Sequence, residues 1–296
     1  MYLGVYVENK KSFLKKFHVE EYLEKTIEAG LDWKTISVLC DDYKKKWYKK
    51  YDQLTKEIVQ KLNDKPPYQI RVVYGRAKQA NHLAEKIIRK VGKEGKAKYF
   101  DIDLNNYREI ITDLSGVRIL LVRKEDWAIV DDYIRKQFKF FVEEPIAYVC
   151  YGDRHIYDKN LMRIDYTNKG YRSIHYLVKY KGLVCEIQVR TLAEEVYGEY
   201  DHMIRYPYRS DNKFLNRYNR IVSKATSELD DLISTCYSMS DDALALLADE
   251  CKDDEYVDWR SVVDEVKEKQ ALSTNQTIYT KNVSAKSFLH NKLINR

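Results

Sequence analysis

The sequence predicts an α+β fold, with a central mixed, mostly antiparallel sheet of about five strands flanked by helices and a helical C-terminal extension. Two observations lead to this prediction. Short apolar, β-branched runs alternate with segments of helical periodicity in the middle of the chain, and the pattern becomes helical throughout after Arg190. The last two apolar runs are separated only by Lys181-Gly182, which is typical of a β-hairpin.

Amphipathic spacing predicts the helices that precede and separate the strands. We expect helices over 8–30 and 41–63, the second ended by the stretch 64–67 with its two prolines. Further helices are expected over 80–91 and 124–138.

Five apolar runs have the length and composition of buried strands. They are rich in Val, Ile and Tyr, the residue types that favour a pleated, half-buried surface. The expected strands are 70–75, 116–123, 146–151, 174–180 and 183–189.

After the sheet, helices are expected over 191–205, 213–239 and 241–270, followed by a polar segment that begins at Leu272. We therefore divide the chain into four regions. These are an N-terminal helical region (1–66), a sheet domain (67–210), C-terminal helices (211–271) and a polar, flexible tail (272–296).

Composition excludes several classes of protein. With 296 residues, 44% hydrophobic and 33% charged, the chain can bury a sizeable core and is not a disordered protein. No run approaches the length of a membrane span, and the N-terminus lacks the charge order of a secretory signal, so we expect a cytoplasmic protein. Its five cysteines are scattered without a zinc-type spacing.

The net charge of +6 suits a phosphorylated ligand or RNA without choosing between them. The most basic stretch, 44–50, is equally compatible with a solvated helix face and with nucleic-acid contact.

Four polar segments border or interrupt the strands. In the first, Arg76 and Lys78 follow a strand, and Lys86 and Arg89 lie three residues apart on the next helix. Four cations that converge there would form a clamp for a triphosphate. Taken alone, a solvated basic helix face explains them at least as well.

The second segment places Asp113 at the mouth of a buried strand, where its carboxylate can hold Mg²⁺ through oxygen. Arg118 lies inside that otherwise apolar strand and requires a partner if it is buried. A salt bridge at the strand edge is the simpler explanation of Arg118.

The third segment surrounds Gly170, which lets backbone approach a ligand closely. Tyr171 offers a flat face on which a base can stack, and Lys169 and Arg172 can meet phosphates. His175 follows on the next strand, where a lone histidine is more often structural than functional.

In the fourth segment, Glu186, Gln188 and Arg190 point to one side of a strand and the residues between them to the other. A charged row on a central strand indicates a site. On the helix that follows, Glu195 and Glu199 share a face, as they would on any solvated acidic helix.

Together, the motifs GRAK, DLSGVRI, GYRSIH and EIQVRT resemble the synthetase domain of RelA/SpoT-like proteins, in the same order from about Ile70 to Tyr208. With no HDxxED-type hydrolase segment, the chain resembles the small alarmone synthetases. The resemblance implies a nucleotidyltransferase-like fold for the domain 67–210. It also implies transfer of pyrophosphate from ATP to the 3′-hydroxyl of GDP or GTP, which yields a (p)ppGpp-type alarmone and AMP.

The resemblance also implies roles for individual residues. The residues that would hold ATP are Arg76, Lys78, Lys86, Arg89 and Arg118. Asp113 and Glu186 would bind Mg²⁺ and, with Arg118, form the catalytic set. The residues that would bind the acceptor are Lys169, Tyr171, Arg172, His175, Gln188, Arg190 and Glu195. Glu195 stands where many members carry Asn or Asp for guanine recognition.

That departure leaves two other functions open. The same transfer could modify an adenine nucleotide or the 3′-CCA end of tRNA, as in a growth-arresting toxin, with the basic stretch 44–50 as a tRNA contact. Alternatively, the chain could be an inactive nucleotide- or RNA-binding module, although both carboxylates that would bind the metal are present. A homo-oligomer is compatible with the sequence, and no membrane partner is expected.

Overall fold

The structure, a computed structural model, describes residues 10–150, 156–167, 170–205, 209 and 212–239. The chain forms two compact units, 1–230 and 231–296, and the description below concerns the first. Lys169, the helix expected over 241–270 and the tail from 272 lie outside the described residues. The four-region division of the chain stays a prediction.

The sheet has six strands in the order β1-β2-β6-β5-β3-β4. The strands are β1 (Ile70–Ala77), β2 (Ser115–Leu121), β3 (Ile146–Val149), β4 (Arg163–Tyr166), β5 (Ser173–Tyr180) and β6 (Leu183–Thr191). The β2/β6 and β3/β4 pairs are parallel and the other neighbours are antiparallel. The predicted α+β class with a mixed, mostly antiparallel sheet is confirmed.

The structure adds one strand, β4, at the edge of the sheet next to β3. Its four residues, RIDY, are half-buried or exposed and half of them are charged. Such a segment has no apolar run from which a strand could be predicted.

The helices are α1 (Lys10–Phe17), α2 (Glu20–Glu28), α3 (Trp33–Asp42), α4 (Tyr48–Asn63), α5 (Ala80–Ile88), α6 (Tyr107–Ile110), α7 (Trp127–Gln137), α8 (Leu192–Ile204) and α9 (Lys213–Ser238). The segment predicted as one helix over 8–30 is two, because His18 adopts the left-handed region with φ of 49°. π-Helical turns extend α3 and α5, over Tyr43–Trp47 and Arg89–Lys93.

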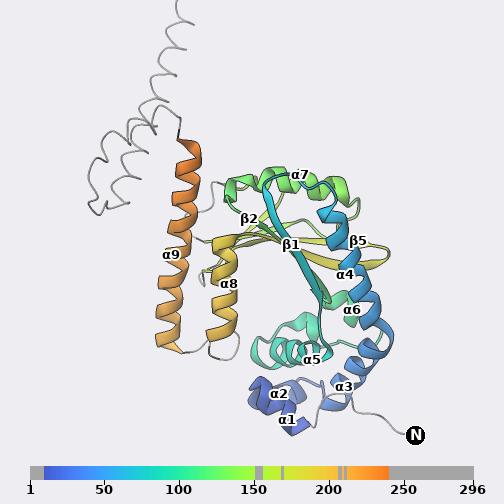
Figure 1. Cartoon of the computed structure of the whole chain (residues 1–296). Coiled ribbons are helices and arrows are strands. Elements are labelled where there is room, and N and C mark those ends of the chain that lie inside the picture. Colours follow the sequence, from blue (N-terminus) through green and yellow to red (C-terminus); the bar gives the residue numbers. More distant parts are fainter. Residues whose placement is uncertain (1–9, 151–155, 168–169, 206–208, 210–211, 240–296) are drawn as a thin grey trace, which may run out of the picture. The chain divides into compact units, whose positions relative to one another are not determined.

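Helices α4 and α7 cover one face of the sheet (Figure 1). On that face the core consists of buried apolar side chains of the central strands, such as Val117 and Ile187. Tyr176 of β5 donates a hydrogen bond across this core to Asp131 of α7 (3.0 Å). The apolar half of each strand is therefore used for packing, and the polar half is left for the opposite face.

Helix α8 lies at the opposite face, and α9 runs beside it (Figure 1), where Asn219 of α9 donates to the hydroxyl of Tyr197 of α8 (2.7 Å). The hairpin between β5 and β6 turns through Lys181 and Gly182, both with positive φ, as its two-residue loop requires. This turn fixes which residues of β6 face α8.

Among the residues that the structure describes, none of the helices has both the length and the apolarity needed to cross a membrane.

Candidate active site

The polar face of the sheet collects side chains from four adjacent strands. In the β2/β6 pair, Gly116 is opposite Glu186 and Arg118 is opposite Gln188. On the two outer sides, Tyr74 of β1 pairs with Arg118, and His175 of β5 pairs with Gln188. Residues that pair across strands share a face, so the segments noted in the sequence meet on one surface.

At one end of this surface, the carboxylate of Asp113 binds two lysines. The Nζ of Lys78 lies 3.0 Å from Oδ2, and the Nζ of Lys86 lies 2.8 Å from Oδ1. Burial alone would raise the pKa of Asp113, but Lys86 and then Lys78 hold it well below its usual range. Asp113 is therefore ionised and balanced by two cations.

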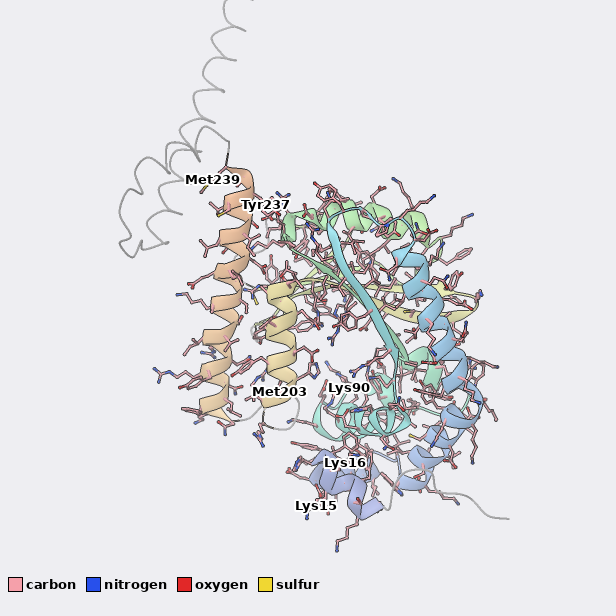
Figure 2. All side chains as sticks on the ribbon, in the orientation of Figure 1. Lys15, Lys16, Lys90, Met203, Tyr237 and Met239 are labelled. Atoms are coloured by element: carbon pink, nitrogen blue, oxygen red, sulfur yellow. The ribbon has the colours of Figure 1, made fainter. Side chains whose placement is uncertain are left out.

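The other two cations of the predicted clamp lie elsewhere. Arg76 is exposed on β1. Arg89, at the start of the π-helical turn, binds Glu85 (2.7 Å) and Glu94 (2.5 Å), and Glu94 also binds Lys90, labelled in Figure 2. The structure thus brings two of the four cations of the predicted triphosphate clamp together at Asp113.

Five side chains of β5, β6 and the loop before β5 form a ring, joined by four hydrogen bonds and closed by the ion pair between His175 and Glu186. Gln188 donates to Glu186 (2.5 Å), and Arg190 donates to Gln188 (2.6 Å) and to the hydroxyl of Tyr171 (2.6 Å). That hydroxyl lies 2.8 Å from Nε2 of His175, whose Nδ1 is 3.7 Å from Glu186. The alternation predicted for β6 is confirmed, because its three polar residues all belong to this ring.

The ring shifts the ionisation of its members. Burial disfavours the charged imidazole, yet Tyr171 and Glu186 raise the pKa of His175 to about 9. The same histidine outweighs the effect of burial on Glu186 and keeps its pKa below the usual value. At neutral pH, a histidine cation therefore stands beside a carboxylate anion.

A second cluster surrounds Arg118. Its guanidinium donates to Glu195, to Glu199 (2.6 Å) and to the hydroxyl of Tyr74 (3.0 Å). Tyr74 donates to the same oxygen of Glu195 (2.5 Å), and Arg190 donates to the other oxygen (3.1 Å). Glu195, 121 residues from Tyr74 in sequence, therefore joins this cluster to the ring.

Asp113 and Glu186, the two predicted metal ligands, lie close enough to influence each other, since the charge on Asp113 opposes ionisation of Glu186. Their side chains are 23% and 15% exposed. Within the described part of the chain, no group of three or more His, Cys, Asp or Glu residues is arranged to hold a metal. Two carboxylates fit Mg²⁺, which usually takes its other ligands from water and substrate phosphates.

The sequence did not identify Tyr74 or Tyr148 as site residues. The ring of Tyr148, on β3, contacts His175 and Tyr171 with centroids 4.8 Å and 6.0 Å away. Neither residue belongs to a motif, and each is recognised only from its pairing with a motif strand. Arg172 points away from the ring and donates to the hydroxyl of Ser223 on α9 (3.3 Å).

A family model matches the part of the chain that carries the predicted site residues. It is described as a region found in RelA / SpoT proteins and matches residues 75–211. The matched residues include the four motifs on which the resemblance to RelA/SpoT-like proteins rests.

Among curated proteins, the chain is similar to the GTP pyrophosphokinase YjbM of Bacillus subtilis (strain 168), with 28% identity over 175 residues that cover 56% of this chain and 71% of the relative. A solved structure of the small alarmone synthetase 1 from Bacillus subtilis bound to its product pppGpp is 22% identical, covering 63% of this chain and 92% of that one, with a TM-score of 0.44. A GTP pyrophosphokinase family protein from Streptococcus pneumoniae is 19% identical, covering 73% and 91%, with a TM-score of 0.41.

Proposed function

We propose that this chain transfers pyrophosphate from ATP to the 3′-hydroxyl of GDP or GTP, with Mg²⁺ as its cofactor, and releases AMP. The observation that carries the proposal is the placement of Asp113 and Glu186 on one polar surface, flanked by Lys78, Lys86 and Arg118, within a RelA/SpoT region. The name of the curated relative, a GTP pyrophosphokinase, supports the same reaction.

The donor side of the site is built from cations and carboxylates. Lys78 and Lys86 are held within 3.0 Å of Asp113, so they are in place to exchange this carboxylate for phosphate oxygens when ATP enters. Mg²⁺ bound to Asp113 and Glu186 would neutralise charge on the transferring phosphates. Arg76, Arg89 and Arg118 remain proposed ATP contacts.

The acceptor side is built around Glu186. In the proposed step, the acceptor's O3′ forms a bond to the β-phosphorus of ATP while the bond from that phosphorus to the α–β bridging oxygen breaks. The electron pair leaves with AMP, and the hydroxyl proton passes to Glu186. Because transfer to phosphorus depends mainly on positioning and charge neutralisation, the fixed orientation of Glu186 by Gln188 and His175 is its main contribution.

Recognition of the acceptor is assigned to the same ring and its loop. Tyr171 is proposed to stack on the base, with its hydroxyl held by Arg190 and its ring bordered by Tyr148. Contacts to the acceptor phosphates are proposed for His175, Gln188 and Arg190 of the ring, for Arg172, and for Lys169, which lies outside the described residues.

The test is a transfer assay with γ-³²P-ATP and Mg²⁺ in parallel reactions containing GDP, GTP, ADP or deacylated tRNA. We expect label on the guanosine nucleotides. Asp113→Asn and Glu186→Gln should each lower the rate by about 10²-fold or more, because each removes a charge that acts on the transferring group. Asp132→Asn, which neutralises a carboxylate 62% exposed on α7, serves as the matched control and should leave the rate unchanged.

Label found on tRNA or ADP and absent from GDP and GTP would refute the proposed acceptor. Substantial activity in Asp113→Asn or Glu186→Gln would refute the proposed metal site.

A further inference from the structure

Glu195 and Glu199 lie one helical turn apart on α8 and contact the same guanidinium nitrogen of Arg118. Their surroundings differ sharply. The side chain of Glu195 is 11% exposed, whereas that of Glu199 is 58% exposed. Two carboxylates on one arginine can have opposite effects on a ligand that needs this arginine.

Glu195 is fixed from three directions. One of its oxygens accepts from Arg118 and from the Tyr74 hydroxyl, and the other accepts from Arg190, whose side chain is only 2% exposed. With both oxygens engaged, this carboxylate has little capacity left to accept hydrogen bonds from a guanine base. Its removal would leave two guanidinium groups close together without the anion that separates them.

Glu199 makes one of these contacts from the solvent side. An exposed ion pair of this kind contributes little to stability and is readily exchanged for another anion. Arg118 lowers the pKa of Glu199 through the hydrogen bond between them, so this carboxylate is ionised at neutral pH.

From these contacts we infer that Glu195 is a positioning residue, which with Tyr74 holds Arg118 and Arg190 in place, and that Glu199 is a displaceable carboxylate that competes with a substrate phosphate for Arg118. This inference rests on the proposed function, since it takes Arg118 to be a contact of the ATP phosphates. Glu195 would thus tie the donor half of the site to the acceptor half, through one arginine in each.

The experiment is titration calorimetry of the full chain with Mg²⁺ and α,β-methylene-ATP, which binds without transfer. Glu199→Gln should tighten binding about two- to fivefold, because a competing anion is removed. Glu195→Gln should weaken it at least tenfold, because Arg118 loses its fixed partner. Asp132→Asn should bind as the unaltered chain does.

Tyr74→Phe provides a milder version of the Glu195 change, since it removes one donor to Glu195 and keeps the aromatic ring. It should weaken binding about threefold or more while leaving the chain folded, which thermal unfolding checks. In transfer assays, Glu195→Gln should raise the KM of both ATP and the acceptor, whereas Glu199→Gln should change only the KM of ATP. A merely structural role for Glu195 would not produce this division.

If Glu195→Gln and Glu199→Gln change the affinity in the same direction, or if Tyr74→Phe binds as tightly as the unaltered chain, the inference is overturned. If the unaltered chain does not bind the analogue, the proposed function fails together with the inference. If it binds but the variants behave otherwise than predicted, only the inference fails.

Discussion

Asp230, on α9, is a buried carboxylate whose replacement should stabilise the protein in a pH-dependent way. It is 2% exposed and accepts one hydrogen bond, from the hydroxyl of Thr191 (2.9 Å). Burial, and then the nearby charge of Glu194, raise its pKa from the usual 3.8 to about 7. Lys124 and Arg172 act in the opposite direction without cancelling this rise.

The direction in which stability changes with pH follows from proton linkage. Because the folded chain holds the Asp230 proton more tightly than the unfolded chain, stability falls as the pH rises from about 4 to about 7, and the full penalty remains above pH 7. At 1.36 kcal/mol for each tenfold change in proton affinity, the penalty reaches about 4 kcal/mol at pH 8. At pH 5 it is about 2 kcal/mol by the same relation.

Asp230→Asn removes the charge and keeps an oxygen that can accept from Thr191. The stability of the variant relative to the unaltered chain should therefore increase by about 2 kcal/mol between pH 5 and pH 8. Urea unfolding at pH 5, 6, 7 and 8 measures this difference, with Asp132→Asn as the exposed control. A difference that is the same at all four pH values would refute the reasoning.

Two further predictions concern packing and buried polar groups. Gly92→Ala should destabilise the fold by about 3 kcal/mol or more, because the added Cβ would lie 1.9 Å from the carbonyl oxygen of Tyr22. Gly116→Ala is the control and should cost less than about 1 kcal/mol, because a Cβ there meets nothing nearer than 3.9 Å. Equal melting temperatures for the two variants would contradict this. Tyr176→Phe should cost about 1–3 kcal/mol in urea unfolding, since the buried oxygen of Asp131 loses its donor, and an unchanged midpoint would show that this hydrogen bond contributes nothing net.

Much of the fold was predictable because the central strands carry their own signals. The row Glu186, Gln188 and Arg190 alternates with buried residues, and the Lys181-Gly182 turn fixes the register of β6, so local sequence alone determines which face is polar. These are properties of neighbouring residues, and the structure confirms them.

What could not be predicted depends on contacts between distant segments. From the sequence, Tyr74 looks like an ordinary strand residue, and it belongs to the site only because β1 lies beside β2. From the sequence, Glu195 looks like part of a solvated acidic helix, but it is buried because α8 packs over the two arginines of the central strands. From the sequence, Arg89 looks like one of four phosphate-binding cations, yet its guanidinium lies within 2.7 Å of the carboxylates of Glu85 and Glu94.

Because the polar surface combines distant segments, the order of synthesis determines when the site can form. Arg118 precedes Glu195 by 77 residues, so at 5–20 residues per second a ribosome needs about 4–15 seconds to pass from one to the other. During that time β2 lacks β6, its neighbour on one side, and the carboxylate of Glu186, whose charge interacts with that of Asp113, has not been made. A nascent chain that stalls before Glu186 therefore carries only one of the two carboxylates, and the site can form only after the last strand of the sheet has been synthesised.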